Sequence, residues 1–279
     1  MLEVYGNASS IHHFGQAAKQ KLDAARRQVA ELLRCHPAEV VFVSGGTEAD
    51  NLAIFGTLRR NSPPAGKHVI TTAIEHPAVL NACAQLEREG AAVTYLPVGA
   101  SGVVDPDDVR RALRPDTALI TVMHANNELG TVQPLRDIAA VVERERQQRL
   151  AAGNLHPIFL HSDASQAVGL LDISVARLGV DLMTIGAGKC YGPKQVGLLW
   201  LRAGLRLQPL INGGGQENNL RSGTENVAGV IGFAEAVAIA VATRKQESYR
   251  LGQLRDRLWA NLERAVPGIV RNGHPKRHV

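Results

Sequence analysis

The sequence predicts an α/β fold in which helices cover both faces of a mostly parallel seven-stranded sheet. Short runs of β-branched and other apolar residues alternate along the chain with longer segments of helical periodicity. Runs that are apolar at almost every position are typical of parallel strands buried on both faces. The expected strands span residues 39–43, 68–72, 91–96, 117–123, 157–161, 181–185 and 197–201.

Helical patterns fill most of the gaps between these runs. The clearest cover residues 47–58, 77–89 and 135–151, and a charged amphipathic helix is expected from about residue 246. The apolar run "VAGVIGFAEAVAIAVAT" contains Glu235, and its 17 residues fall short of the roughly 20 that a bilayer crossing needs. We expect a buried helix there and no membrane span.

The end of the sequence predicts a second, smaller domain. A charged helix followed by a strand-like start suggests the first part of a small α+β unit. We therefore expect an N-terminal segment over residues 1–15, a large domain over 16–245 and the beginning of a small C-terminal domain over 246–279. The segment "NSPPAGK" at 61–67 is a predicted loop.

Composition and charge exclude several classes of protein. The 279 residues are 45% hydrophobic, which is enough for a large globular core. The net charge is +5, but basic and acidic residues alternate in "RRQVAELLR" (26–34) and "VVERERQQR" (141–149), which favours solvated helix faces over a nucleic-acid surface. Cys35, Cys83 and Cys190 have no disulfide-framework or metal-site spacing, and the N-terminus has no secretory signal pattern. We expect a cytoplasmic protein without a metal site or nucleic-acid partner.

Polar side chains follow five of the predicted strands. In an open parallel sheet, ligands bind at the carboxyl ends of the strands. Because these segments meet at one edge of the sheet, together they predict a binding site. The segments are 44–48, 75–77, 124–128, 162–166 and 186–189.

The stretch "SGGTEADN" places small residues directly before a helix. The first amides of a helix lack partners within it, and its dipole favours an anion there. Gly46 and Thr47 are therefore candidates for holding a phosphate, although an ordinary helix cap explains the same residues.

Three further residues suggest a flat cationic ligand. His76 precedes a helix, where its imidazole is suited to stack on a flat ring or to cap the helix. A cation beside Asp163 would lower the pKa of this carboxyl, and a pyridinium nitrogen is one such cation. Gln166, three residues further on, is placed to reach a phenolic oxygen of the same ring.

Lys189 completes this set in the stretch "GAGKCYGPKQVG". Gly186 and Gly188 allow a flat ligand to approach its amine closely, and partial burial would make the amine a better nucleophile. A solvated loop lysine is the alternative for Lys189 taken alone. Together with the anion site, His76 and Asp163, the lysine favours a pyridoxal-phosphate site.

Seven segments of the chain resemble the NifS-like cysteine desulfurases and selenocysteine lyases. This family belongs to the class V branch of the fold-type I pyridoxal-phosphate enzymes. The segments occur in the family's order and at its spacings. They are "GNASSIHHFG", "VVFVSGGTEADNLAI", "EHPAVL", "HANNELGTVQP", "HSDASQAVG", "DLMTIGAGKCYGPKQVGLLWLR" and "GGGQENNLRSGTENV".

The resemblance implies a role for each candidate residue. Lys189 would be the Schiff-base lysine and His76 would lie on the pyridine ring, whose nitrogen would pair with Asp163. Gln166 and Asn127 would lie near the phenolic oxygen. The resemblance assigns the phosphate to Gly46 and Thr47, with backbone contacts from Gly186 and Gly188, and implies that Thr224 reaches the cofactor of a second subunit in a homodimer.

The chain departs from the family pattern at three places. The family's Ser-x-His before the lysine is Gly186-Ala187-Gly188 here, which leaves only backbone amides there and puts phosphate affinity in doubt. The chain also begins inside the pattern. Family members continue for roughly a hundred residues more, carrying the persulfide-forming cysteine and a carboxylate-binding arginine, so we expect a fragment whose own cysteines are not nucleophiles.

The implied reaction converts L-cysteine to L-alanine and transfers sulfur to an acceptor, such as an iron–sulfur scaffold protein. A class V aminotransferase and a selenocysteine lyase remain alternatives, because the residues that separate them lie mostly outside this sequence. An alternative of another class is a non-catalytic pyridoxal-phosphate binder that pairs with a complete enzyme.

Overall fold

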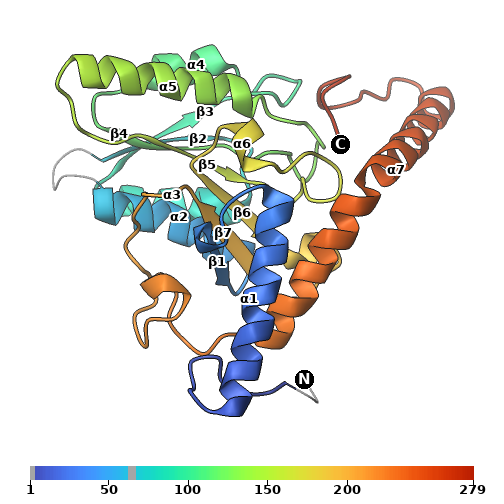
Figure 1. Cartoon of the computed structure of the whole chain (residues 1–279). Coiled ribbons are helices and arrows are strands. Elements are labelled where there is room, and N and C mark those ends of the chain that lie inside the picture. Colours follow the sequence, from blue (N-terminus) through green and yellow to red (C-terminus); the bar gives the residue numbers. More distant parts are fainter. Residues whose placement is uncertain (1–3, 62–66) are drawn as a thin grey trace.

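The computed structural model describes residues 4–61 and 67–279, and it forms one mixed sheet covered by helices (Figure 1). The strand order is β1-β7-β6-β5-β4-β2-β3. Strand β7 is antiparallel to both of its neighbours, and the other strand pairs are parallel. The strands are β1 (Val40–Val43), β2 (His68–Thr72), β3 (Ala92–Leu96), β4 (Thr117–Thr121), β5 (Phe159–Asp163), β6 (Leu182–Gly186) and β7 (Gly197–Leu201).

Helices cover both faces of this sheet and enclose two apolar cores. One core contains residues of α2 and α3, and the other contains residues of α1, α4, α5, α6 and α7. The helices are α1 (His13–Leu33), α2 (Gly46–Asn61), α3 (Pro77–Arg88), α4 (Pro106–Ala112), α5 (Leu135–Ala151), α6 (Val175–Leu178) and α7 (Val227–Ala265). Three 3-10 turns, η1 (Pro37–Glu39), η2 (Ala187–Lys189) and η3 (Glu217–Asn219), complete the described elements.

The predicted fold class is confirmed, and each observed strand overlaps its predicted range. Strand β3 is the exception to burial on both faces, because it lies at the edge of the sheet and buries only Leu96. The sequence patterns predicted only part of α1 and did not predict the short α4 and α6. Residues 62–66 of the predicted loop lie outside the described residues.

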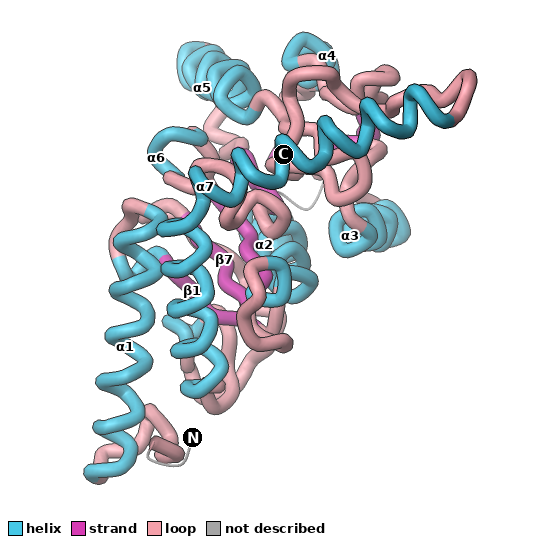
Figure 2. The backbone as a smooth tube through the Cα atoms, turned by 90° about the vertical axis from the view of Figure 1, so that its right-hand side faces the viewer, coloured by secondary structure: helices cyan, strands magenta, loops and turns pink. Residues whose placement is uncertain are grey.

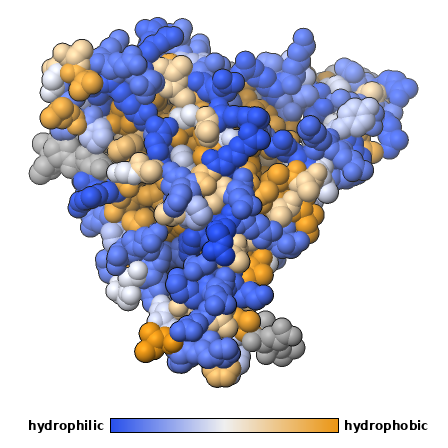
Figure 3. Space-filling view, in the orientation of Figure 1, coloured by the Kyte–Doolittle hydropathy of each residue, from blue (hydrophilic) through white to orange (hydrophobic). Residues whose placement is uncertain are grey.

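Helix α7 differs from its prediction as a buried helix. It is 39 residues long and packs one face beside α1 (Figure 2), but only 33% of its most apolar window is buried. By length and composition alone the helix meets the criteria for a membrane span. Ile231 and Ile239 are exposed on it, and Figure 3 shows hydrophobic residues on the flank that α7 occupies in Figure 1. The predicted domain boundary at 245/246 falls inside this helix and stays a prediction.

Two arginines from the predicted solvated helix faces are instead largely buried. Arg149 lies on α5 and donates hydrogen bonds to the backbone oxygens of Thr117 and Arg114. Arg26 on α1 forms a two-pronged ion pair with Glu217, which also accepts a hydrogen bond from the backbone of Phe42 at 2.8 Å. These buried guanidinium groups satisfy strand-end and loop polar groups, so part of the basic charge is structural.

Phe233 tests the packing of α7 against the sheet. Its side chain is fully buried in the larger core, so Phe233→Ala is expected to lower the free energy of unfolding by about 3–5 kcal/mol. The matched control Leu150→Ala, at a side chain that is 72% exposed, should change it by less than about 0.5 kcal/mol. Urea unfolding of the three proteins measures both values, and equal losses would contradict the predicted packing.

Candidate active site

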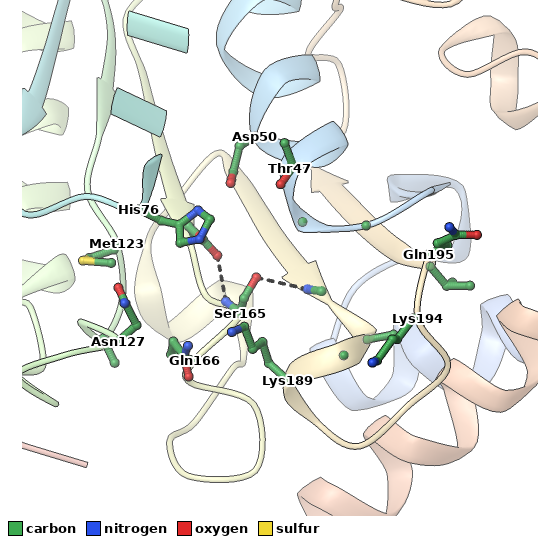
Figure 4. Close-up of a pocket in the computed structure, with 18 residues that line it drawn as sticks. Thr47, Asp50, His76, Met123, Asn127, Ser165, Gln166, Lys189, Lys194 and Gln195 are labelled. Carbon is green, nitrogen blue, oxygen red and sulfur yellow. Dashed lines mark hydrogen bonds between the residues drawn. The ribbon is translucent and has the colours of Figure 1, made fainter. Parts of the chain in front are cut away.

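A cavity of about 250 Å³ opens at the carboxyl ends of the central strands (Figure 4). It collects side chains and backbone from the segments that follow β1, β2, β4, β5 and β6. The strand-end pattern therefore predicted the place of the cavity. Of the candidate residues, those that line it are Gly46, Thr47, His76, Asn127, Asp163, Gln166, Gly186, Gly188 and Lys189.

Thr224 does not line this cavity. It lines a neighbouring cavity of about 390 Å³, which shares Gln195 and Val196 with the first. The segment that carries Thr224 is tied to the start of α2, because Arg221 Nε donates to Glu48 Oε1 at 3.0 Å. Within one chain, Thr224 therefore lies beside the site rather than in it.

His76 both caps a helix and lines the cavity, as its position before a predicted helix suggested. It is the N-cap residue of α3, and its Nδ1 accepts a hydrogen bond from the backbone of Ala78 at 3.1 Å. That bond fixes the ring and leaves the proton of the neutral form on Nε2. The ring projects into the cavity (Figure 4), so the capping bond orients the imidazole for contact with a ligand.

Asp163 is the last residue of β5, two residues beyond the predicted strand end at 161. Its Oδ1 accepts a hydrogen bond from the backbone of Ser165 at 2.9 Å, and Ser165 Oγ in turn accepts one from Gly186 at 3.1 Å. Burial raises the pKa of Asp163, although the Ser165 bonds and the positive charges of His76 and Lys189 oppose that rise. A cation at this carboxylate would offset the cost of its burial.

A buried polar layer lies close to Asp163. The ring nitrogens of His161 lie 2.8 Å from Thr121 Oγ1 and 3.0 Å from Thr184 Oγ1, and burial lowers its pKa to about 3. Asp50 is 1% exposed and lines the cavity, and burial together with the charge of Asp163 raises its pKa. Within the described residues, Asp50 Oδ1 has no hydrogen-bond partner. Burial disfavours the charged form of both groups, so His161 stays neutral and contributes no cation to Asp163.

Lys189 lies in η2, directly after β6, and faces the cavity opposite His76 (Figure 4). Lys189 is an exposed residue in this chain, and partial burial of its amine stays a prediction. The turn that carries it is held by hydrogen bonds from Cys190 and Gly192 to the backbone oxygen of Ala187. A nucleophilic amine at a fixed position and open to the cavity is suited to covalent capture of a carbonyl ligand.

The three thiols lie in environments that suppress their reactivity. Burial raises the pKa of Cys35 to about 12 and that of Cys83 to about 12. Cys190 is 4% exposed, its pKa is raised by burial, and its Sγ donates to Ala187 O at 3.3 Å. The expectation that these cysteines are packing residues fits this burial, because the thiolate is the reactive form.

Four polar cavity residues, Asp50, Ser165, Lys194 and Gln195, received no role from the sequence patterns. Asp50 lies one turn into α2, and its i+4 spacing from Gly46 could have placed it on the face toward the strand ends. Ser165 was quoted in the segment after β5 but received no role. Lys194 and Gln195 come from the turn between η2 and β7, and no spacing signal points to them.

The cavity brings together an amine, an imidazole, a partly buried carboxylate and a helix N-terminus on the edge of an α/β sheet. These features define a class of α/β proteins that hold a flat, anionic cofactor against a lysine. The chain belongs to the aminotransferase class-V family, whose sequence model matches residues 1–278. Members of this family are pyridoxal-phosphate enzymes.

Individual relatives carry more specific names. The chain is 45% identical over 271 residues to the cysteine desulfurase IscS of Dictyoglomus turgidum, covering 97% of this chain and 66% of the relative. It is 42% identical over 279 residues to the cysteine desulfurase IscS of Methanosarcina thermophila, again covering 66% of that relative. The chain thus spans about two-thirds of the length of these curated relatives.

Solved structures show the same fold. A NifS-like protein matches with a TM-score of 0.86 at 37% identity, covering 92% of this chain and 68% of that one. SspA in complex with cysteine matches with a TM-score of 0.77 at 40% identity, covering 84% of this chain and 65% of that one. The recognition of the family from seven sequence segments is confirmed.

Glu75, which precedes His76 but does not line the cavity, gives the stability of the fold a measurable pH dependence. Burial raises the pKa of Glu75 from 4.5 to about 8, and its Oε1 accepts hydrogen bonds from Thr72 and Met123. An acid whose pKa is raised by folding stabilises the folded state at low pH and loses that contribution as the pH rises from 4.5 through 8. The wild-type chain should therefore lose about 3–5 kcal/mol of unfolding free energy across this pH range. Glu75→Gln, which keeps the accepting oxygen, should not show this loss.

Urea unfolding at a series of pH values measures this effect. The exposed Glu263→Gln is the matched control and should leave the pH profile of the unfolding free energy unchanged. Parallel profiles for the wild-type chain and Glu75→Gln would contradict the raised pKa.

Proposed function

We propose that this chain is the cofactor-binding part of a pyridoxal-phosphate-dependent cysteine desulfurase. The observation that carries the proposal is the convergence of Lys189, His76 and Asp163 on one cavity. Relatives at 40–45% identity named cysteine desulfurase, and the similarity to SspA in complex with cysteine, support this choice of reaction and substrate.

The donor set of the cavity fits pyridoxal phosphate. Asp163 is a partly buried carboxylate whose pKa stays raised despite the charges of His76 and Lys189, which suits a pyridinium nitrogen. The start of α2, at Gly46 and Thr47, suits an anion because helix amides point outward there. Lys189 supplies the amine that a carbonyl cofactor needs.

Each residue then has one task. Bound pyridoxal phosphate supplies a carbonyl carbon and a ring that accepts electrons. Lys189 Nζ would bind that carbon, and as a free amine it would hold or move a proton at the substrate Cα. Asp163 would pair with the ring nitrogen, and His76 would cover one face of the ring. Asn127 and Gln166, which line the same cavity, would lie near the phenolic oxygen.

The sulfur step needs a thiol that is not among the three cysteines of this sequence. In the proposed reaction the Cβ–S bond of L-cysteine breaks, the acceptor thiolate takes the sulfur as a persulfide, and L-alanine is released. Cys35, Cys83 and Cys190 have raised pKa values, so they provide little thiolate at neutral pH. An iron–sulfur scaffold protein is a proposed final recipient, in keeping with the IscS names.

We also propose that the protein works as a homodimer in the cytoplasm. Thr224 lies beside the site within its own chain, in a segment held close to α2 by Arg221 and Glu48, and the family resemblance implies that it reaches the cofactor of a second subunit. Exposed Ile231 and Ile239 on α7 provide apolar surface for such a contact. Free cysteines at positions 35, 83 and 190 support a reducing compartment.

The Lys189 assignment is tested by absorption spectroscopy. The purified chain mixed with pyridoxal phosphate is expected to show the visible band of a lysine-bound cofactor, and Lys189→Ala should abolish it. The exposed Lys245→Ala is the control and should keep the band. No band in the wild-type chain, or a band that survives in Lys189→Ala, would refute the assignment.

The same preparation tests the sulfur step. With L-cysteine and a reductant, we expect little or no sulfide, because none of the three thiols is activated. Rapid sulfide release that is lost when one of these cysteines is replaced by alanine would identify that cysteine as the acceptor and overturn this part of the proposal. Formation of the 2-oxo acid of cysteine without release of sulfide would favour the aminotransferase alternative.

A further inference from the structure

The phosphate end of the cavity carries little positive charge of its own. It is formed by Gly45, Gly46 and Thr47 at the start of α2, facing Gly186 and Gly188. A helix N-terminus offers about half a positive elementary charge. A phosphate monoester brings up to about two negative charges. The helix alone therefore leaves the anion largely uncompensated.

Two ammonium groups line the cavity, on Lys189 and Lys194. In the proposed function Lys189 binds the cofactor's carbonyl carbon, so its amine is not available to the phosphate. Lys194 is exposed, and within the described residues no hydrogen bond or ion pair engages its amine. It is therefore the cation that remains for the phosphate.

The backbone holds the Lys194 turn close to the lysine-bearing turn. Gly192 N donates to Ala187 O at 3.0 Å, and Ala187 N donates to Val196 O at 3.0 Å, so both ends of the segment are tied to η2. Gln195 adopts the left-handed conformation, with φ of +60°, which a non-glycine residue takes only where its surroundings enforce it. In Figure 4 the Lys194 amine lies on the same side of the cavity as Lys189.

Gly188 leaves open space in the wall next to this turn. A Cβ atom built at Gly188 would meet no atom within 4 Å, and the backbone there does not require glycine. The similar family places an imidazole at this position, as its sequence pattern implies. The open space and the missing side chain together leave room for the Lys194 amine to reach the phosphate.

We propose that Lys194 is a phosphate-binding residue of this cavity and replaces the cation that Gly188 cannot supply. This inference rests on the proposed function, because it assigns one more contact to the same cofactor. The lysine would compensate for the side chains missing at Gly186-Ala187-Gly188, from which the sequence analysis expected a weaker affinity for phosphate.

The test compares two ligands that differ only in the phosphate. Spectroscopic titration of the cofactor-free chain gives dissociation constants for pyridoxal 5'-phosphate and for pyridoxal, and their ratio isolates the phosphate contribution. Lys194→Gln should lower the preference for the phosphorylated ligand about 10- to 100-fold, as expected for loss of a charge-assisted hydrogen bond. Lys194→Arg should retain most of the preference, and the exposed Lys245→Gln should retain all of it.

A second variant separates a charge contact from a structural role. Gly188→His in the Lys194→Gln background should restore part of the preference, and more of it at pH 6 than at pH 8, because only the protonated imidazole carries the charge. The fold accommodates this change, since Gly188 has open space around it.

The outcomes are distinct. A Lys194→Gln variant that keeps the wild-type preference, or that loses both ligands equally, overturns the role of Lys194. A wild-type chain that binds neither ligand overturns the proposed function instead.

Discussion

A partly buried carboxylate at the floor of the cavity is the constraint on which the site depends. Asp163 ends the central strand β5 and is held by the backbone of Ser165, whose hydroxyl also fixes Gly186 at the end of β6. Burial raises its pKa, and the charges of His76 and Lys189 only oppose that rise, while burial favours the neutral forms of the nearby Asp50 and Glu75. Holding the ionised carboxylate of Asp163 at this position costs free energy, and a cationic ring nitrogen beside it would offset that cost.

The surrounding structure keeps this arrangement rigid. The Arg26–Glu217 ion pair links α1 to the segment that leads to Thr224, and the Arg221–Glu48 pair links that segment to the first turn of α2. The first turn of α2 holds Thr47. Buried ion pairs of this kind fix geometry more surely than they add stability. The phosphate end and the Thr224 segment are thus joined within one chain.

Much of this arrangement is readable from the sequence. Each strand appears as a short run of β-branched or other apolar residues. Polar residues directly after five of these runs predicted the place of the cavity, because the carboxyl ends of parallel strands meet at one edge of the sheet. Lys189 and Asp163 gained their roles from the resemblance to a known family, and the structure places both at the cavity. Asp50 and Lys194 were missed, since tertiary packing rather than sequence spacing turns them toward the ligand. Arg26 and Arg149 were predicted to be solvated because a charged helix face does not reveal partners that lie far away in the sequence. These partners are Glu217 for Arg26 and the backbone of Thr117 for Arg149.

The central claim is that Asp163 holds a proton on the cofactor's ring nitrogen. Pyridoxal phosphate labelled with nitrogen-15 in the ring, bound to the chain at neutral pH, reports this proton directly through its chemical shift. We predict a protonated ring nitrogen in the wild-type chain and an unprotonated one in Asp163→Asn, with the cofactor bound in both. An unprotonated nitrogen in the wild-type chain, or the same shift in both proteins, would contradict the role assigned to Asp163.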